Sequence, residues 1–597
     1  MNIQKTFRLL ASRRCVDRVL HRRAGRRISI VALLWPVLCP VLAVAQSVPP
    51  GDLGEAARRA EQLQREELLR QQQQFQNDRQ SERPPTQIEI APPPVTASPA
   101  DSVCLPVERV SVEGVSLLPA DEVDPVLRRY EQRCLGVADI ERLLGEITMQ
   151  YMTRGYITAR AYLPAQDLTT GALRLQVIEG KVEQLVLEDG GRRSIRFGNV
   201  LPNVVGEPLN LRDFEQALDQ LNRLASNNAR FDLRPGSEAG NSIVVITNEP
   251  RRRWTPTLSY DNQGSESTGR DQLGVNLAVD RPLGLNDFIS LTHRRAVPYD
   301  ADRKASQSNS LTYMLPYGYS TFSLNVSQST YDSAIAASSG GSLKTSGESN
   351  AGALRADYLA YRNQRARAGI YGNLARKSSK NYLEGTLIGV SSRTLSVADI
   401  GGTYSTALGG GALSLDLAYS RGLPILGALD DPGFLPSRAP RAQFDAFRLN
   451  ASYLYPFTLV GQRWQWSSQF NGQLTPHSLY GSEQLLIGSL YTVRGFMRNT
   501  LSGDNGFYSR NDLSVSLPLD FGGLIPGLLR PYVALDYGQV SNRVSGVPEG
   551  DLAGAAAGLA YQSRHVRADV FYSHAVAKPD AMPSEGGVTY FRLSLNL

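Results

Sequence analysis

The sequence predicts a mainly β protein, a transmembrane antiparallel β-barrel of about sixteen strands preceded by two small α/β modules and a polar N-terminal helix. Three observations carry this prediction. From Trp254 to Leu597 the chain repeats segments of about 10 residues that alternate apolar with polar side chains and end in Gly, Asn, Asp or Ser. Two consecutive segments before that stretch share the order strand, helix, helix, strand, strand. No segment after residue 45 is long and apolar enough for a membrane helix, so strands are expected to cross the membrane.

Residues 1–45 are organised like a secretory signal peptide. A basic region ends at Arg27, an apolar run interrupted by two prolines follows, and Ala43-Val44-Ala45 offers a cleavage site of small residues. A membrane anchor is the alternative, which the prolines and the polar residues after Ala45 disfavour. This leader contributes +8 to a formal net charge of +6, so the rest of the chain carries −2. The basic character therefore does not indicate a nucleic-acid partner.

Cleavage after the leader would leave two of the four cysteines in the mature chain. Cys15 and Cys39 lie in the leader, whereas Cys104 and Cys134 follow it. Because an even number of cysteines in an exported chain favours oxidation, we expect a Cys104–Cys134 disulfide. Two buried free thiols are the alternative.

The region 46–81 is predicted to contain a helix, with a weak apolar stripe on a strongly polar segment at 52–80. Such a helix has little to bury, so it is expected to lie in water or in a polar cavity. A disordered Gln-rich tail is the alternative. Six prolines at 82–102 predict an extended linker.

The two α/β modules are assigned to 103–182 and 183–250. In the first, a strand is expected at 107–115, helices at 121–130 and 137–154, and further strands at 159–163 and 173–178. In the second, the expected elements are strands at 182–187, 230–234 and 242–247 and a helix that opens at 210–213.

The barrel is assigned to 251–597. An even strand number lets an antiparallel sheet close, and the stretch allows about 21 residues for each of sixteen strands with its connection. A soluble β-sandwich or solenoid is the alternative, but it does not explain the aromatic residues at the ends of many strands or the strand pattern that reaches Leu597.

A short charged motif stands out within this strand pattern. Val493-Arg494-Gly495-Phe496 lies in a loop-like stretch, where Gly495 permits a turn that a Cβ would obstruct. Asp536 lies on a later strand, two residues before Gly538. An arginine in a polar lumen can form two parallel hydrogen bonds to one carboxylate, so Arg494 and Asp536 are predicted to pair. A coincidence of two surface charges is the alternative.

The sequence offers little to a catalytic interpretation. The five histidines have no metal-ligand spacing, and no nucleophile elbow, phosphate-binding loop or dinucleotide fingerprint is present. We therefore expect no enzyme activity, no catalytic residue, no metal and no cofactor.

Several motifs in order resemble the two-partner secretion transporters, the TpsB family. Val493-Arg494-Gly495-Phe496 is similar to the motif of the family's sixth loop, placed here around 488–504, and Asp536 with Gly538 is similar to its later strand motif, although Ala534 departs from the usual first residue. The segments that resemble the two POTRA (polypeptide-transport-associated) domains and the opening of the barrel are Cys104 to Val110, Cys134-Leu135, Arg154 to Leu173, Leu209 to Gln216, Leu221 to Arg223, Arg234 to Gly236 and Tyr260 to Gly264.

The resemblance implies a function and a location. The helix at 46–81 takes the position of the family's pore plug, and the modules correspond to periplasmic POTRA domains. The expected protein is a Gram-negative outer-membrane transporter that moves a large unfolded TpsA-type exoprotein, such as an adhesin, haemolysin or contact-dependent toxin, to the cell surface. The other expected partners are outer-membrane lipid, lipopolysaccharide and the barrel-assembly machinery during biogenesis. Alternatives are a barrel-assembly insertase and, from another class, a passive porin or surface receptor.

Overall fold

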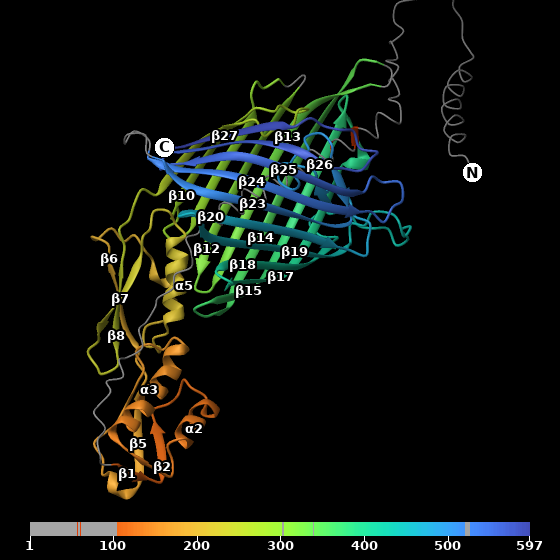
Figure 1. Ribbon diagram of the computed structural model, residues 1–597. Helices are drawn as coiled ribbons and strands as arrows, with labels where there is room; N and C mark the ends of the chain where they lie inside the picture. The colour runs from red at the N-terminus through yellow and green to blue at the C-terminus, as the bar shows by residue number, and fades with distance from the viewer. Residues whose placement is uncertain (1–55, 58–59, 61–103, 301–303, 338–339, 520–525) are drawn as a thin grey trace, which may run out of the picture. The chain divides into compact units, whose positions relative to one another are not determined.

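The computed structural model describes most of the chain after the expected linker (Figure 1). The described residues are 56–57, 60, 104–300, 304–337, 340–519 and 526–597. The predicted signal peptide and proline-rich linker lie outside them, as does nearly all of the predicted plug helix. Within that helix region, Ala56, Ala57 and Ala60 are helical, and Ala56 and Ala60 are buried. Among the described helices, none combines the length and the apolar character needed to span a bilayer.

The first module has a three-stranded sheet and a separate two-stranded ladder. The sheet order is β2-β5-β4, with β2 parallel to β5, and the ladder joins β1 to β3. The strand expected at 107–115 is β2, which is shorter at both ends, and Val107 instead ends β1, which pairs with β3. Helix α3 buries Leu143, Ile147 and Tyr151, which share one face at intervals of four residues. The elements are β1 (Leu105–Val107), β2 (Arg109–Glu113), α2 (Ala120–Arg128), β3 (Arg133–Leu135), α3 (Val137–Thr153), β4 (Arg160–Tyr162), η2 (Leu168–Thr170) and β5 (Ala172–Ile178).

The second module repeats the three-stranded plan with the sheet order β6-β8-β7 and a parallel β6–β8 pair. Helix α5 begins after Asn210, whose side chain accepts a hydrogen bond from the Arg212 N–H, as an N-cap residue does. The helix buries Phe214, Leu218 and Leu221 against the sheet. The elements are β6 (Val182–Glu188), α4 (Phe197–Val200), α5 (Leu211–Asn222), β7 (Arg230–Pro235) and β8 (Ser242–Thr247).

The rest of the chain forms a closed antiparallel β-barrel, as the alternating pattern predicts. Within the described residues it has sixteen wall strands. Strand β27 pairs with β9, with Arg592 opposite Asp261 and Asn596 opposite Thr257, and this pairing closes the cylinder. The wall strands are β9 (Trp254–Asp261), β10 (Gln272–Asp280), β11 (Phe288–Ala296), β12 (Ala305–Tyr317), β13 (Ser320–Ala336), β14 (Ser342–Arg362), β15 (Ala366–Leu383), β17 (Arg393–Leu408), β18 (Gly411–Leu423), β19 (Asp445–Leu459), β20 (Gln462–Leu474), β23 (Asn505–Leu519), β24 (Gly527–Ser541), β25 (Gly550–Gln562), β26 (Val566–Ala577) and β27 (Val588–Asn596).

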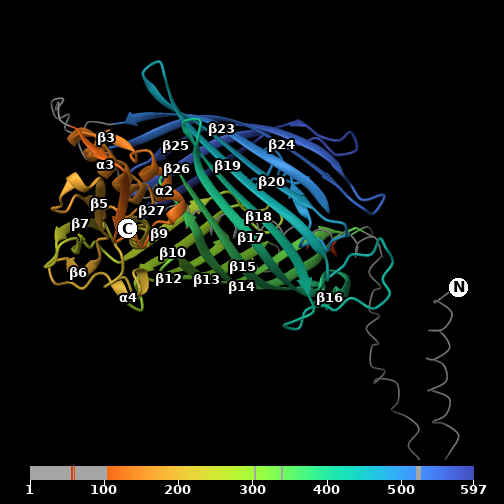
Figure 2. The same ribbon diagram turned by 90° about the horizontal axis from the view of Figure 1, so that it is seen from below.

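The wall strands vary in length more than the sequence pattern predicts. Strand β9 has 8 residues, whereas β14 has 21. The first half of β14 is polar on both faces, so it lacks the alternation that marks a lipid-facing strand and is still paired along its length with β13. Strand β16 (Thr386–Leu387) is a two-residue addition to β15. Figure 2 shows β12 to β15 and β23 to β26 on opposite sides of the barrel.

The two faces of the wall differ in the way that a membrane barrel requires. On β24, Val533, Leu535 and Tyr537 are 56%, 66% and 41% exposed, whereas Ala534 and Asp536 are each 4% exposed. Because successive strand residues point to opposite faces, the apolar side chains lie on the outer surface and Asp536 points into the lumen. The alternation therefore places a carboxylate where a loop inside the barrel can reach it.

Candidate functional site: a loop anchored inside the barrel

The connection from β20 to β23 is a long segment that contains its own small hairpin. This segment, residues 475–504, is called the anchored loop below. Its hairpin pairs β21 (Leu485–Ile487) with β22 (Leu501–Gly503). The loop therefore begins earlier than the 488–504 expected from the motif, because Leu485 to Ile487 form a hairpin strand and not a piece of the wall. The tetrapeptide Val493 to Phe496 lies between the two hairpin strands.

The structure brings the predicted pair, Arg494 and Asp536, into direct contact. Arg494 Nε lies 2.6 Å from Asp536 Oδ2, and Arg494 Nη2 lies 2.7 Å from Oδ1. The backbone N–H of Arg494 donates to Oδ2 at 3.0 Å. The two side chains are only 5% and 1% exposed. A two-pronged contact with an added backbone bond fixes the direction of the arginine as well as its position.

Two further charged residues of β23 complete this site, and neither was predicted from the sequence. Arg494 Nη1 lies 2.8 Å from Asp512 Oδ1, so the guanidinium contacts two carboxylates. Arg510 lies directly across the ladder from Asp536 and donates from Nη1 to the carbonyl oxygen of Tyr491 at 3.2 Å. Arg510 and Asp512 are two positions apart on β23 and so share one strand face, and this shared parity was the available signal.

Three glycines let the loop backbone approach the wall closely. Gly495 has a φ of +101°, and a Cβ there would lie 2.5 Å from the backbone of His574. A Cβ on Gly538 would lie 3.0 Å from the Val493 side chain. A Cβ on Gly554 would lie 1.6 Å from the Arg494 carbonyl oxygen, and Gly554 is the cross-strand partner of Asp536. Gly495 and Gly538 were predicted as parts of the motifs, whereas Gly554 was not.

Apolar packing holds the other two motif residues. Val493 and Phe496 are 0% and 2% exposed. They lie in one cluster with loop residues and with wall residues from three strands. The remaining members of this cluster are Ile487, Leu501, Tyr508, Val540 and Leu552. The charged contact is thus surrounded by buried side chains, which lowers the local dielectric and strengthens it.

The tip of the loop is tied to a second loop by a carboxylate. The backbone N–H groups of Met497, Arg498 and Asn499 donate to Glu585, which lies in the connection between β26 and β27, over 2.6–3.2 Å. Three successive N–H groups around a carboxylate form an anion-binding nest. Arg498 Nε also lies 2.6 Å from Glu266, an exposed contact.

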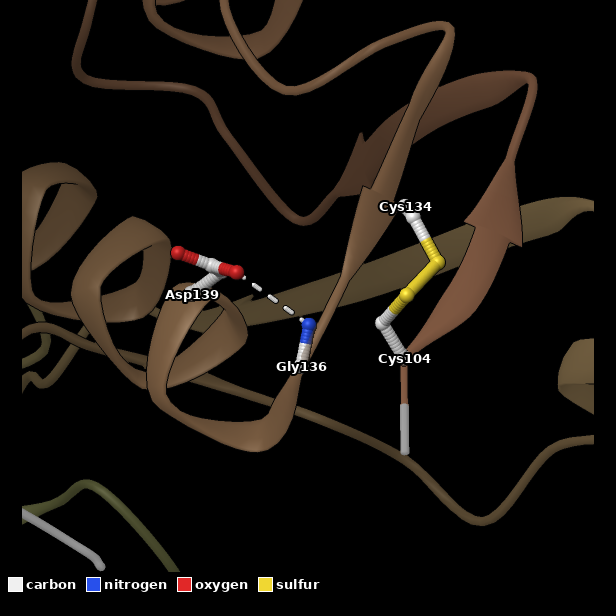
Figure 3. The surroundings of a disulfide bond; sticks show 4 residues. All are labelled: Cys104, Cys134, Gly136 and Asp139. Atoms are coloured by element: carbon white, nitrogen blue, oxygen red, sulfur yellow. Dashed lines mark hydrogen bonds between the residues drawn. A yellow bond between two sulfur atoms is a disulfide. The ribbon is translucent and has the colours of Figure 1, made fainter. Parts of the chain in front are cut away.

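The predicted disulfide is present in the first module. Cys104 and Cys134 are bonded, with Cα atoms 5.4 Å apart and a sequence separation of 30 (Figure 3). The bond joins the residue before β1 to β3, the strand with which β1 pairs. In the same view the Gly136 N–H donates to Asp139 Oδ2 at 3.2 Å where α3 begins. The disulfide therefore staples a ladder of only three residue pairs.

A closed lipid-facing barrel that holds an inward loop by an arginine–carboxylate contact, preceded by two small α/β modules, defines the class of outer-membrane polypeptide transporters. The profile described as "Haemolysin secretion/activation protein ShlB/FhaC/HecB" matches residues 240–561, a ShlB-type POTRA profile matches 105–180, and a second POTRA profile matches 181–235. The chain belongs to the ShlB/FhaC/HecB family.

Individual relatives match most of the chain. The outer membrane transporter CdiB of Escherichia coli strain 536 is 32% identical over 94% of this chain and 93% of its own length. The hemolysin transporter protein ShlB of Serratia marcescens is 35% identical over 74% of this chain and 77% of its own. The solved structure of CdiB from Escherichia coli superposes with a TM-score of 0.81 at 30% identity, covering 91% of this chain and 98% of that one.

The protein is accordingly an outer-membrane transporter of a two-partner secretion system, with its POTRA domains in the periplasm. Transporters of this family act together with TpsA exoproteins.

Proposed function

We propose that this transporter exports one large exoprotein, an adhesin, haemolysin or contact-dependent toxin, as an unfolded chain through the barrel. The observation that supports the proposal most directly is the contact of the buried Arg494 with Asp536 and Asp512, which holds a loop against the lumen side of the wall. A loop in that position can govern what passes through. The protein would act without catalysing a reaction, with folding of the cargo outside the cell preventing its return.

The POTRA domains are proposed to receive the cargo by strand addition. In the first domain β2 and β4 are the outer strands of the sheet, and in the second these are β6 and β7. Main-chain hydrogen bonds from such edges give affinity for an extended chain, and the side-chain surroundings give selectivity. In this proposal, residues 103–182 and 183–250 are two POTRA domains that bind the cargo, and residues 251–597 form the barrel through which it passes.

The Arg494–Asp536 pair is proposed to act as a conformational latch for the anchored loop. Removing one partner of a buried ion pair costs about 3–5 kcal/mol, and less where water reaches the site. The segment 46–81 is proposed as a plug, preceded by a cleaved leader at 1–45. The apolar outer face of β24 supports lipid as a partner, and lipopolysaccharide and the barrel-assembly machinery are proposed as further partners during biogenesis.

Depletion of the protein tests this function against the alternatives. We expect one large exoprotein to disappear from the culture supernatant while the set of outer-membrane barrels stays unchanged, as measured by quantitative proteomics of both fractions. Loss of many barrels would instead indicate an insertase. Loss of small-solute uptake with normal exoprotein levels would indicate a porin or receptor.

A further inference from the structure

A buried carboxylate near the start of the anchored loop contacts two wall cations. Glu483 precedes β21, and its side chain is 1% exposed. Its Oε1 lies 2.7 Å from Lys377 Nζ, and its Oε2 lies 3.0 Å from Arg448 Nη2. Both carboxylate oxygens are therefore engaged by a cation, which is the arrangement that a buried charge requires.

The two cations come from strands on one side of the loop. Lys377 lies on β15 and Arg448 on β19, and the wall order there is β15-β17-β18-β19-β20. Arg494 makes its contact on the other side, with β24, in the order β20-β23-β24. Glu483 and Arg494 thus attach the same loop to two different parts of the wall (Figure 2 shows the strand order).

One glutamine links this contact to both ends of the loop. Gln473, at the end of β20, accepts a hydrogen bond from Arg448 Nε at 3.1 Å through its Oε1. Its Nε2 donates to the carbonyl oxygens of Glu483 and Asp504 at 3.0 and 3.1 Å. Because Asp504 is the last residue before β23, the same side chain holds the two ends of the loop together.

The triad of Glu483, Lys377 and Arg448 is not needed to hold the wall strands together. The strands β15, β17, β18 and β19 are joined to one another by uninterrupted backbone ladders. Glu483 contributes a contact from the loop to these strands and not between them. Loss of its charge is therefore expected to free the loop and to leave the cylinder closed.

We propose that Glu483, held by Lys377 and Arg448, is a second fixed point of the anchored loop and that Arg494 stays on its carboxylates only while Glu483 is charged. Glu483 is a positioning residue in this scheme, since it acts through the loop. The link to secretion rests on the proposed function, whereas the effect on the loop does not.

A cysteine reporter in the loop measures this effect without any cargo. Thr492 is 0% exposed, so Thr492→Cys in full-length protein in detergent, kept non-reducing to preserve the Cys104–Cys134 disulfide, reacts with a maleimide only when the loop opens. Adding Glu483→Gln is expected to raise the labelling rate about tenfold or more, because the rate follows the open population and a buried pair has been broken. An unchanged rate overturns the proposal.

Two controls separate loop release from general damage. Lys344→Gln removes a 41% exposed cation that lies 3.6 Å from Asp332, away from the loop, and is expected to leave the rate unchanged. A cysteine at Phe434, which is 88% exposed, is expected to react at one rate with and without Glu483→Gln. Heat-modifiable migration in gels checks that each barrel is folded. A rise in Thr492→Cys labelling in the Lys344→Gln protein would show that the reporter detects nonspecific loosening and would overturn the assignment.

The cations give an independent test of the triad. Lys377→Met and Arg448→Met are each expected to raise the labelling rate, and each is expected to add little once Glu483→Gln is present, since the partners form one network. Fully additive effects would show that Glu483 does not act through these cations and would contradict the proposal. If the loop opens in Glu483→Gln and secretion remains normal, the latch function is wrong and the second fixed point stands.

Discussion

At the scale of single residues, Arg494 is held by more than the one carboxylate that its motif predicts. Asp536 accepts three hydrogen bonds from it, and Asp512 lies 2.8 Å from its third guanidinium nitrogen. Arg510 lies across the ladder from Asp536 and adds a second cation to the same pair of strands. The site is thus a balanced cluster of two arginines and two aspartates that joins the anchored loop to β23 and β24.

Removal of the Arg494 charge should release the anchored loop and leave the barrel folded. Arg494→Ala is expected to insert into the outer membrane at normal levels and to lower exoprotein secretion about tenfold or more, because the buried Asp536 and the partly exposed Asp512 lose their common partner. The readout is supernatant exoprotein per folded barrel. Arg421→Ala serves as the control, since Arg421 is 60% exposed and 3.8 Å from Asp445. Wild-type secretion by Arg494→Ala contradicts the latch.

The exchange variant Arg494→Asp with Asp536→Arg should rescue secretion only in part. The new arginine at 536 would lie opposite Arg510, and the new aspartate at 494 would lie near Asp512. Like charges at close range oppose the exchanged pair. Full rescue, measured by the same secretion assay, would show that the neighbouring charges do not matter.

A substitution at Gly554 should displace the anchored loop as much as loss of the Arg494–Asp536 ion pair does. Gly554→Ala places a Cβ 1.6 Å from the Arg494 carbonyl oxygen, so the loop must move away from β25. We expect lower secretion and faster labelling of Thr492→Cys. Gly372→Ala on β15, where a Cβ meets nothing within 4 Å, is the matched control and should behave as wild type. Equal behaviour of the two variants would refute the close approach.

At the scale of elements, a disulfide bond and the hydrogen bonds of one carboxylate connect the elements of the first POTRA domain. The β1–β3 ladder has three residue pairs and is joined by the disulfide. Glu179, after β5, accepts hydrogen bonds from the Ser116 and Leu117 N–H groups at 2.7 and 2.8 Å and from the Tyr151 hydroxyl at 2.7 Å. This carboxylate therefore connects the loop before α2 with α3.

Loss of the disulfide should destabilise this domain and leave the barrel intact. Cys104→Ser with Cys134→Ser is expected to lower its free energy of unfolding by about 3–4 kcal/mol on the chain-entropy model for a loop of this length. Denaturant titration followed by proteolysis of the first domain measures the change, and heat-modifiable migration reports on the barrel. Reduction of the wild-type protein should reproduce the effect, and a reduced protein of unchanged stability would argue against it.

The Glu179 carboxyl should make the first domain sensitive to acid. Burial acts to raise its pKa, but the hydrogen bonds from Ser116, Leu117 and Tyr151 outweigh burial and hold the pKa below its ordinary value of 4.5. A lowered folded-state pKa gives stability that is complete above pH 4.5 and is lost as the pH falls through the folded-state pKa. Hydrogen exchange at the Ser116 and Leu117 amides should follow this course relative to Glu179→Gln, which should lack it. Parallel pH curves would contradict the assignment.

At the scale of the whole molecule, closure of the barrel depends on a short seam. Strand β27 meets β9 over five residue pairs from Arg592–Asp261 to Asn596–Thr257, whereas β14 and β15 pair over a much longer ladder. An open seam would expose unpaired backbone groups to lipid, where they cannot be satisfied. The seam is therefore the weakest point of the cylinder.

Shortening β27 should prevent closure. A chain that ends at Phe591 is expected to lose heat-modifiable migration and to be degraded, because every partner of β9 on that side is gone. A chain that lacks only Leu597, which follows the last ladder pair and adds one backbone hydrogen bond to Pro256 of β9, should still fold because all five pairs remain. Stable membrane insertion of the shorter chain would show that β9 and β27 need not pair.

The sequence by itself determined the features that depend on neighbours along the chain. Alternation of apolar and polar residues is local, so it predicted the barrel and the lumen-facing position of Asp536. The helix faces of the two modules followed from periodicity, the cysteine pair from the even number of cysteines in an exported chain, and the Arg494–Asp536 pair from two motifs.

Beyond those two pairs, only the tertiary structure decided which distant residues meet. Asp512 and Gly554 lie beside Arg494 because of ladder register, and Glu483 reaches Lys377 and Arg448 because the loop folds back over other strands. The doubly polar half of β14 is a strand because β13 pairs with it. Strand register, the path of the loop and strand pairing are set by contacts between segments far apart in the chain. A local sequence pattern does not predict those contacts.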